Sequence, residues 1–161
     1  MLMEIVKISK LEKEEYDQLI QKRCMSHITF KREKYPYIAP FLYVFDKTFM
    51  YFISTKYGAK IQYFQQYPYV SVEVEQISKD FSTYAFVSLR GRLFEVEDIP
   101  RKKAVLEMFV RMIEKNNISK NIMIALGHSP EDQLDVIASE QRVMIWKLGD
   151  VEKIIGLTSG T

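Results

Sequence analysis

Two apolar and aromatic runs separated by a short turn constrain the fold more than any other feature of the chain. Residues Tyr37–Phe45 and Phe49–Ser54 flank Asp46-Lys47, a pattern that predicts a β-hairpin. Both runs are almost continuous in apolar and aromatic residues, so we expect both faces of the hairpin to be covered. Pro36 and Pro40 are unfavourable in a fully paired central strand, which indicates a barrel corner, a bulge or a ligand-binding edge there.

Further strands are predicted on both sides of this hairpin. Met25–Phe30 alternates between apolar and polar residues, and in Val70–Glu75 valines alternate with polar side chains, as in strands with one solvated face. Phe81–Val96 reads as a long strand, and Gly91 in its middle is typical of a bend or bulge in a barrel strand. Val143–Leu148 is a last strand. With few helices and no regular βαβ units, these strands predict a small antiparallel barrel.

A few helices are expected around the barrel. Ser9–Glu12 has the pattern of a capping box, and the helix that follows is predicted to end at about Arg23. Asp98 is expected to cap a second helix, with Pro100 in its first turn. A short helix is predicted from Ser129. The buried stripe of the second helix is expected to contain Val105, Met108, Phe109 and Met112.

Length and composition favour one cytoplasmic globular domain. A chain of 161 residues suits a single domain with one core, and its net charge of +2 is too small to argue for nucleic-acid or membrane binding. We find no signal peptide and no apolar run long enough to span a membrane. The single domain, 1–161, is divided into an N-terminal strand and helix (1–23), a barrel core (24–96), a helix (98–115), a loop, short helix and closing strand (116–156), and a frayed tail (157–161).

The cysteine and histidine content argues against several kinds of site. Cys24 is the only cysteine, which excludes an internal disulfide and a CxxC motif, and no base for a catalytic thiolate is evident. His27 and His128 are the only histidines and are far apart in the sequence, so no metal site is predicted. His27 could meet a phosphate or a flat ring, or could be an ordinary histidine at the end of a barrel strand.

The strongest functional signal follows the second strand of the hairpin. Ser54 and Thr55 provide hydroxyl groups, Gly58 and Ala59 open a short helical segment, and Lys60 adds an ammonium group. Hydroxyls, the N–H groups at a helix start and one cation are the groups that bind a phosphate monoester. The segment is not a Walker loop, and the sequence contains no GxGxxG motif. We therefore predict a phosphate-bearing ligand.

Several motifs, in order, resemble the pyridoxamine 5'-phosphate oxidase-like FMN-binding split barrels, in particular their nitroimidazole-resistance-type members. YPYIAP (35–40) resembles the family's G-R-P-Y-V-V-P strand, and the segment 51–60 resembles I-Y-F-H-S-A-x-x-G-R-K. YPYVSV (67–72) is similar to N-P-x-V-x-F, and the segment 87–98 is similar to V-x-x-x-G-x-A-x-x-V-E-D. Residues 143–156 resemble the closing strand. The resemblance implies a mainly β, six-stranded antiparallel split β-barrel with Greek-key topology.

The resemblance also implies a cofactor and its contacts. In that family FMN lies between two subunits, with the strand equivalent to Ile38–Phe41 (Ile38, Ala39, Pro40 and Phe41) beside the isoalloxazine ring. Ser54 then matches a hydroxyl contact, Thr55 the residue after it, and Lys60 the phosphate lysine. His27 stands where many members carry an arginine. The chain departs from the family pattern at Ile53, which replaces a His or Tyr, at Ala59, which replaces an Arg or Lys, and at Phe86, which replaces a Ser or Gln.

The function expected from these observations is that of an FMN-dependent oxidoreductase acting on a small flat substrate, with no catalytic residue assigned. A non-catalytic flavin or haem protein for storage or sensing is the alternative, and a deazaflavin could replace FMN. A nucleic-acid-binding barrel is a weaker alternative. We also expect a homodimer with ligand sites at its interface, because eleven aromatic residues are too many for one small core. They are Tyr35, Tyr37, Phe41, Tyr43, Phe49, Tyr51, Phe52, Tyr63, Phe64, Tyr67 and Tyr69.

Overall fold

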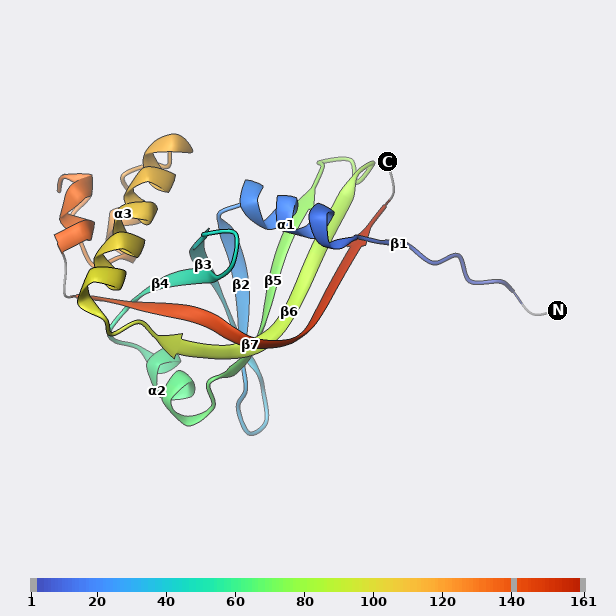
Figure 1. The fold of residues 1–161 in the computed structure, drawn as a ribbon, viewed down its shortest axis with the longest axis horizontal. Coiled ribbons are helices and arrows are strands. Elements are labelled where there is room, and N and C mark those ends of the chain that lie inside the picture. The colour runs from blue at the N-terminus through green and yellow to red at the C-terminus, as the bar shows by residue number, and fades with distance from the viewer. Residues whose placement is uncertain (1–2, 140–141, 160–161) are drawn as a thin grey trace.

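The chain forms a closed antiparallel β-barrel, which confirms the predicted mainly β, six-stranded fold. The computed structural model describes residues 3–139 and 142–159. The sheet order is β1-β7-β4-β3-β2-β5-β6, and pairing between β6 and β7 closes all strands except β1 into the barrel (Figure 1). Strand β5 lies beside β2, so β2 to β5 form a Greek key. The strands are β1 (Ser9–Lys10), β2 (Met25–Phe30), β3 (Tyr37–Phe45), β4 (Met50–Thr55), β5 (Tyr69–Ile77), β6 (Tyr84–Glu95) and β7 (Val143–Thr158).

Helices cover both ends of the barrel and part of its outer face. In Figure 1, α1 lies on the upper side, α2 lies below the barrel, and α3 stands at the left beside a 3-10 helix, η1. Among the residues that the structure describes, no helix is long and apolar enough to cross a membrane. The helices are α1 (Lys13–Lys22), α2 (Ala59–Gln66), α3 (Ile99–Lys115), α4 (Ile122–Ala125) and η1 (Leu134–Ser139).

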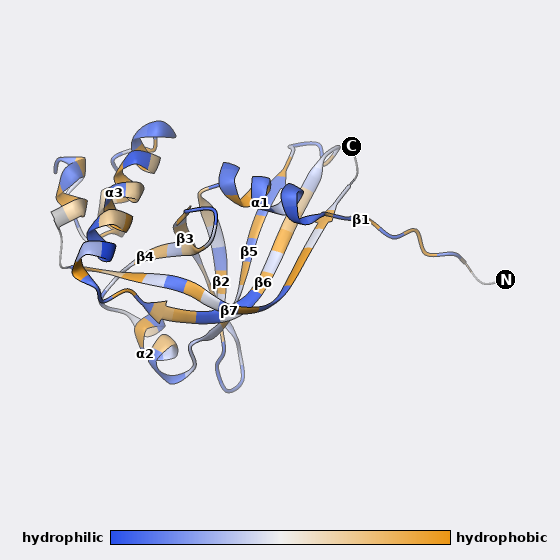
Figure 2. Cartoon of the chain, in the orientation of Figure 1, coloured by the Kyte–Doolittle hydropathy of each residue, from blue (hydrophilic) through white to orange (hydrophobic). Residues whose placement is uncertain are grey.

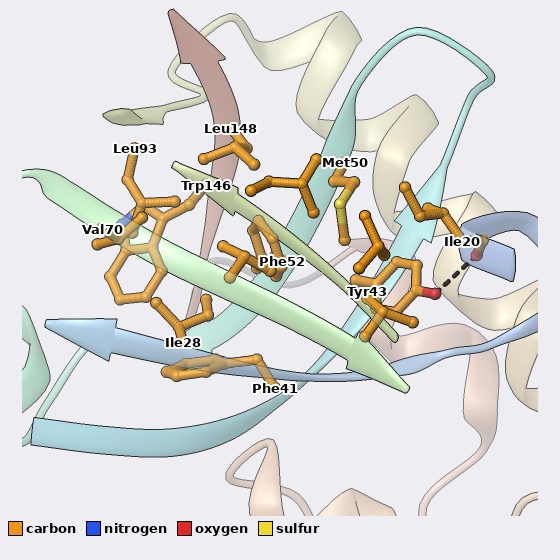
Figure 3. Close-up of a cluster of buried hydrophobic side chains, with 14 of the residues drawn as sticks. Ile20, Ile28, Phe41, Tyr43, Met50, Phe52, Val70, Leu93, Trp146 and Leu148 are labelled. Atoms are coloured by element: carbon orange, nitrogen blue, oxygen red, sulfur yellow. Dashed lines mark hydrogen bonds between the residues drawn. The ribbon is translucent and has the colours of Figure 1, made fainter. Parts of the chain in front are cut away.

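The barrel interior is a core built around Trp146 of β7. The indole ring is fully buried and contacts Phe30, Phe41 and Phe64, with ring centroids 5.1–5.9 Å apart. Figure 3 shows this cluster, in which the hydroxyl of Tyr43 donates to the carbonyl oxygen of Ile20 in α1 at 2.6 Å. Residues of α1 and α2 pack against the same cluster, so these two helices close the barrel ends.

A second core lies outside the barrel, under α3. Alternate residues of the hairpin and of β7 point away from the barrel interior, and Figure 2 shows the resulting mixture of hydrophobic and hydrophilic positions along the strands. The fully buried residues of α3 differ in part from the predicted stripe: Leu106 and Ile113 are buried, whereas Met108 and Met112 are only partly buried. The helix is contacted by η1 as well as by the sheet, so its buried face is broader than one stripe.

Most of the aromatic residues that suggested a dimer are accommodated within one chain. Phe41, Tyr43, Tyr51 and Phe52 are buried, and another four of the set are partly buried in the two cores. The large exposed ones are Tyr35, Tyr67 and Tyr69. The physical reason given for a dimer is therefore wrong, because two cores on opposite faces of the hairpin take up far more aromatic surface than one.

The irregularity predicted at Gly91 is present between β6 and β7. The register shifts between Arg90 and Arg92, opposite the segment that contains Gly149. A Cβ atom added to Gly91 would lie 2.7 Å from the carbonyl oxygen of Gly149, which is too close. Glycine is therefore required at position 91 because the two strands approach each other closely at the bulge.

Element ends are where the structure departs most from the sequence analysis. The capping box is formed by Glu12 and Glu15, not by Ser9, because Ser9 pairs with Thr158 in the sheet. Strand β7 continues to Thr158, beyond Gly156, so the tail of the described chain is shorter than expected. Strand β6 begins at Tyr84, after a turn closed by bonds to Asp80.

The short helix expected from Ser129 is displaced. The described residues contain α4 before this position, and the 3-10 helix η1 after it. Ser129 instead begins a turn in which its backbone N–H donates to Asp132.

Candidate functional site

The first half of β3 pairs with a neighbouring strand on one side only. Residues Tyr37–Leu42 pair with β2, whereas pairing with β4 is confined to Tyr43–Phe45. The strand therefore separates from β4 along the segment predicted to lie beside a flavin ring. Pro40 lies in this half, where the missing N–H group of proline is tolerated because the strand has an open edge. The predicted ligand edge is thus a split in the barrel wall.

Ser54 and Thr55 end β4 and begin the turn to α2. Both side chains are buried, with exposed fractions of 3% and 4%. The hydroxyl of Ser54 donates to the carbonyl oxygen of Thr55 at 2.9 Å, and that of Thr55 donates to the carbonyl oxygen of Tyr57 at 3.5 Å. In this conformation the two hydroxyls hold the turn, and their oxygen lone pairs remain as acceptors.

Gly58 is the residue that directs the chain into α2. It occupies the N-cap position with φ +104°, a conformation that L-residues rarely adopt. No atom lies within 4 Å of the position that a Cβ would take, so the requirement for glycine is conformational. Ala59 and Lys60 are the first two residues of α2, and at these positions the backbone N–H groups have no partner within the helix. These N–H groups make the start of α2 a favourable position for an anion.

Lys60 is a cation that has no counter-charge in the described chain. Its side chain is partly buried, and Nζ lies 5.7 Å from the centroid of the Phe41 ring. No hydrogen bond or ion pair joins the Lys60 ammonium to any described residue. Burial lowers the pKa of Lys60, because desolvation penalises its charged form. Two predicted site residues, Phe41 on the open strand and Lys60 on α2, are thus brought together.

Three of the remaining predicted residues, Ile38, Pro40 and His27, are exposed on the outer face of β2 and β3, whereas Ala39 is partly buried and packs against the barrel core. Ile38 has an exposed fraction of 62%, Pro40 is also exposed, and the exposed His27 is the cross-strand neighbour of Pro40. On its other side His27 neighbours Glu73 of β5. Burial, followed by the nearby Glu75, raises the pKa of Glu73, and His27 opposes this rise. No hydrogen bond or ion pair between described residues links His27 to Lys60.

A basic hairpin loop next to α2 was not identified as part of the site. Lys31 lies over the ring of Tyr67 at 5.3 Å, and Arg32 lies over Tyr63 at 4.6 Å. Together with Tyr63 of α2 and Tyr67, which follows α2, the loop lines a cavity of about 430 Å³. The signal in the sequence is the series of three cations within residues 31–34, which is equally typical of a charged surface turn.

Other polar candidates have structural explanations. Arg92 packs over Tyr69 and Phe94, at 5.7 and 4.9 Å from the ring centroids. Burial raises the pKa of Cys24, and the nearby Arg23 only partly offsets this effect, so the thiol is not activated. Within residues 3–139 and 142–159, no group of His, Cys, Asp and Glu side chains could hold a metal ion.

Comparison with known proteins agrees with this architecture. A sequence model of the pyridoxamine 5'-phosphate oxidase family matches residues 12–134, which include every predicted site residue. No curated protein matches the sequence.

Solved structures that are similar to this chain share the fold at low sequence identity. A FAD-binding protein from Mesorhizobium loti is 17% identical, covers 95% of this chain and 99% of its own, and has a TM-score of 0.69. A candidate 5-nitroimidazole antibiotic resistance protein from Bacteroides thetaiotaomicron is 19% identical, with coverages of 94% and 87% and a TM-score of 0.63. A candidate pyridoxamine 5'-phosphate oxidase from Listeria innocua is 20% identical, with coverages of 88% and 95% and a TM-score of 0.60.

Proposed function

The chain belongs to the pyridoxamine 5'-phosphate oxidase family, and on this premise we propose that it binds FMN, with Lys60 at the phosphate and Ile38–Phe41 beside the flavin ring. The observation that carries the proposal is the position of Lys60 beside the open edge of β3, as a partly buried cation with no counter-charge among the described residues. The FAD-binding protein among the structural neighbours supports a flavin ligand. Flavin chemistry, when the cofactor is bound, would be electron or hydride transfer.

The electrostatics of Lys60 fit a phosphate ligand. The lowered pKa of Lys60 reflects the desolvation of its charged form, which no ionic partner within residues 3–139 and 142–159 offsets. A phosphate dianion at the start of α2 would supply the missing charge and accept hydrogen bonds from first-turn N–H groups. The positive φ of Gly58 presents those N–H groups, and the buried hydroxyls of Ser54 and Thr55 fix the turn that carries them.

A homodimer is part of the same proposal, with the flavin sites at its interface. Its support is the outer face of the sheet, where four large apolar side chains are exposed on four different barrel strands. They are Met25, Ile38, Tyr69 and Ile155. Ile38 belongs to the segment proposed to lie beside the ring, so a second copy on this face would also cover the ligand. Sedimentation of a monomer at micromolar concentration, with flavin present, would contradict this part of the proposal.

We propose an oxidoreductase reaction on a small, flat substrate that reaches the flavin from the outer face of β2 and β3. The protein would bind and orient the flavin, and the cross-strand neighbours His27 and Glu73 supply titratable groups on that face. The assay is anaerobic reduction of the bound flavin by reduced nicotinamide nucleotides, followed by reoxidation with nitroaromatic or quinone acceptors. A flavin that is bound but is neither reduced nor reoxidised would favour a non-catalytic carrier.

The binding proposal is tested by titrating the protein with FMN, FAD and riboflavin and measuring flavin fluorescence. In wild type, FMN should bind more tightly than riboflavin, which lacks the phosphate. Replacing Lys60 with alanine removes a charge-assisted contact of about 1.5–3 kcal/mol and should weaken FMN about ten- to a hundredfold. Riboflavin binding should be almost unchanged.

Lys56→Ala is the matched control, because Lys56 is an exposed lysine in the same turn. It should leave the affinity for all three flavins nearly unchanged. Unaltered FMN binding in Lys60→Ala, or an equal loss of riboflavin and FMN, would contradict the assignment of Lys60 to the phosphate. If FAD binds as tightly as FMN, the phosphate contact is retained and the cofactor assignment must be broadened.

A further inference from the structure

A second cavity lies between the C-terminal ends of α1 and α3, on the far side of the β3–β4 hairpin from α2. Its volume is about 490 Å³, within the range of small-molecule sites. Figure 1 shows α1 and α3 flanking the turn that joins β3 and β4. None of the lining residues belongs to the candidate flavin site. The cavity is therefore not accounted for by the proposed function.

The charged residues that line this cavity all have the same sign. Lys22 and Arg23 contribute from the end of α1, and Arg111 and Lys115 contribute from the last turns of α3. No aspartate or glutamate is among the described residues that line it. No side-chain hydrogen bond or ion pair joins any of these four cations to another described residue. Cations near helix C-termini interact favourably with the helix dipole. The dipole alone, however, does not explain why two helices both place their cations around one cavity.

The floor of the cavity is apolar. The buried residues Tyr43 and Val44 come from β3, and Met108 and Met112 of α3 complete it. Unbranched methionine side chains adapt to ligands of different shape. An apolar floor below a rim of four cations suits a ligand with a flat or apolar body and several negative charges. Guanidinium groups can bind phosphate oxygens in pairs.

We propose that this cavity binds an organic phosphate with two or more negative charges, of the chemical class of nucleoside di- and triphosphates. The base would lie on the Met108 and Met112 side of the floor, and the phosphates would lie among Lys22, Arg23, Arg111 and Lys115. The site does not require a bound flavin.

The test is calorimetric titration of the protein with ATP, inorganic triphosphate and adenosine, with FMN in excess to occupy the flavin site. ATP should bind with a stoichiometry of about one per chain, and more weakly as salt is added. Inorganic triphosphate should bind less tightly than ATP, and adenosine should not bind measurably. The double variant Arg111→Gln/Lys115→Gln should weaken ATP about tenfold or more.

The matched control is Lys103→Gln/Lys120→Gln, which removes the same charge from exposed positions on and after α3 that do not line the cavity. It should leave ATP affinity nearly unchanged. Lys22→Gln/Arg23→Gln repeats the test from the other helix, in case the first variant does not fold. The Lys60→Ala variant, titrated without FMN, reports whether ATP binds at the start of α2 instead.

Three results would overturn the proposal. They are no heat of binding at about 1 mM ATP, an equal loss of affinity in the cavity and control variants, and a loss caused by Lys60→Ala but not by the cavity variants. Failure of the flavin proposal would appear separately, as an absence of FMN binding in wild type.

Discussion

The hydroxyl of Tyr43 gives the most quantitative test of how α1 is held on the barrel. The hydroxyl donates to the carbonyl oxygen of Ile20 at 2.6 Å, and the tyrosine has an exposed fraction of 1%. Ile20 lies in the last turn of α1, where the backbone carbonyl groups lack N–H donors from within the helix. The Tyr43→Phe substitution keeps the ring and removes the donor, leaving this carbonyl without its tertiary partner.

At neutral pH the variant should lose about 1–2 kcal/mol of unfolding free energy, the usual cost of deleting one partner of a buried hydrogen bond. For a chain of this size, that corresponds to a fall in Tm of about 2–8 °C. The packing of Tyr43 against Phe52, at a centroid distance of 6.4 Å, is retained by phenylalanine.

The difference between wild type and variant should depend on pH above the ordinary pKa of tyrosine. Burial, with a smaller contribution from the nearby Cys24, raises the pKa of Tyr43, while Arg23 opposes the rise. The raised pKa favours the neutral side chain in the fold, so this contribution to stability is fully present below the unfolded pKa of about 10. Above that pH, this contribution to the unfolding free energy falls by about 1.4 kcal/mol for each pH unit. The advantage of wild type should therefore vanish near pH 11, at about one unit above the unfolded pKa.

Equilibrium urea denaturation at a series of pH values from neutral to strongly alkaline measures this difference. Tyr35→Phe is the control, because Tyr35 has an exposed fraction of 69% and should show little change at any pH. Equal stability of wild type and Tyr43→Phe at neutral pH would refute the energetic role of the bond. A difference that stays constant through the alkaline range would refute the assignment of the raised pKa to burial.

Three further outcomes follow from local features. Gly91→Ala should destabilise the fold by about 1–3 kcal/mol in thermal denaturation, because the new methyl group would lie 2.7 Å from the Gly149 carbonyl oxygen; an unchanged Tm would contradict this close approach. Asp98→Ala should cost about 1 kcal/mol, because the Asp98 carboxylate accepts from the backbone N–H of Arg101 at 3.0 Å; chemical denaturation tests it, and a neutral effect would count against the cap. Cys24 should react with iodoacetamide more slowly than an unstructured cysteine peptide at mildly alkaline pH, since burial raises its pKa; equal rates would show that the thiol is accessible and unperturbed.

The barrel was predictable from the sequence because its strands carry local signals. The hairpin around Asp46-Lys47, the alternation in β5 and the glycine at the β6 bulge each depend on neighbouring residues in the chain. The N-terminal cap was mispredicted because Ser9 is held by Thr158, a partner far away in the sequence. The end of β7 was missed for the same reason, since its last residues become a strand by pairing with β6 and β1.

The candidate site was only partly predictable. Lys60 was identified because glycine, alanine and hydroxyl residues precede it within one short segment. Its contact with Phe41 depends on the separation of β3 from β4, which no local pattern records. The roles of Ser54 and Thr55 in holding the turn could not be read either, because burial of a hydroxyl is decided by tertiary packing. The same applies to the basic loop against Tyr63 and Tyr67.

The central claim, that Lys60 binds the phosphate of a flavin at the open edge of β3, is tested most directly by a crystal structure of the protein grown with FMN. We predict that the ammonium of Lys60 lies within about 3 Å of a phosphate oxygen and that the flavin ring lies against Ile38–Phe41. A bound FMN whose phosphate lies away from the first turn of α2, with Lys60 still over Phe41, would contradict the claim.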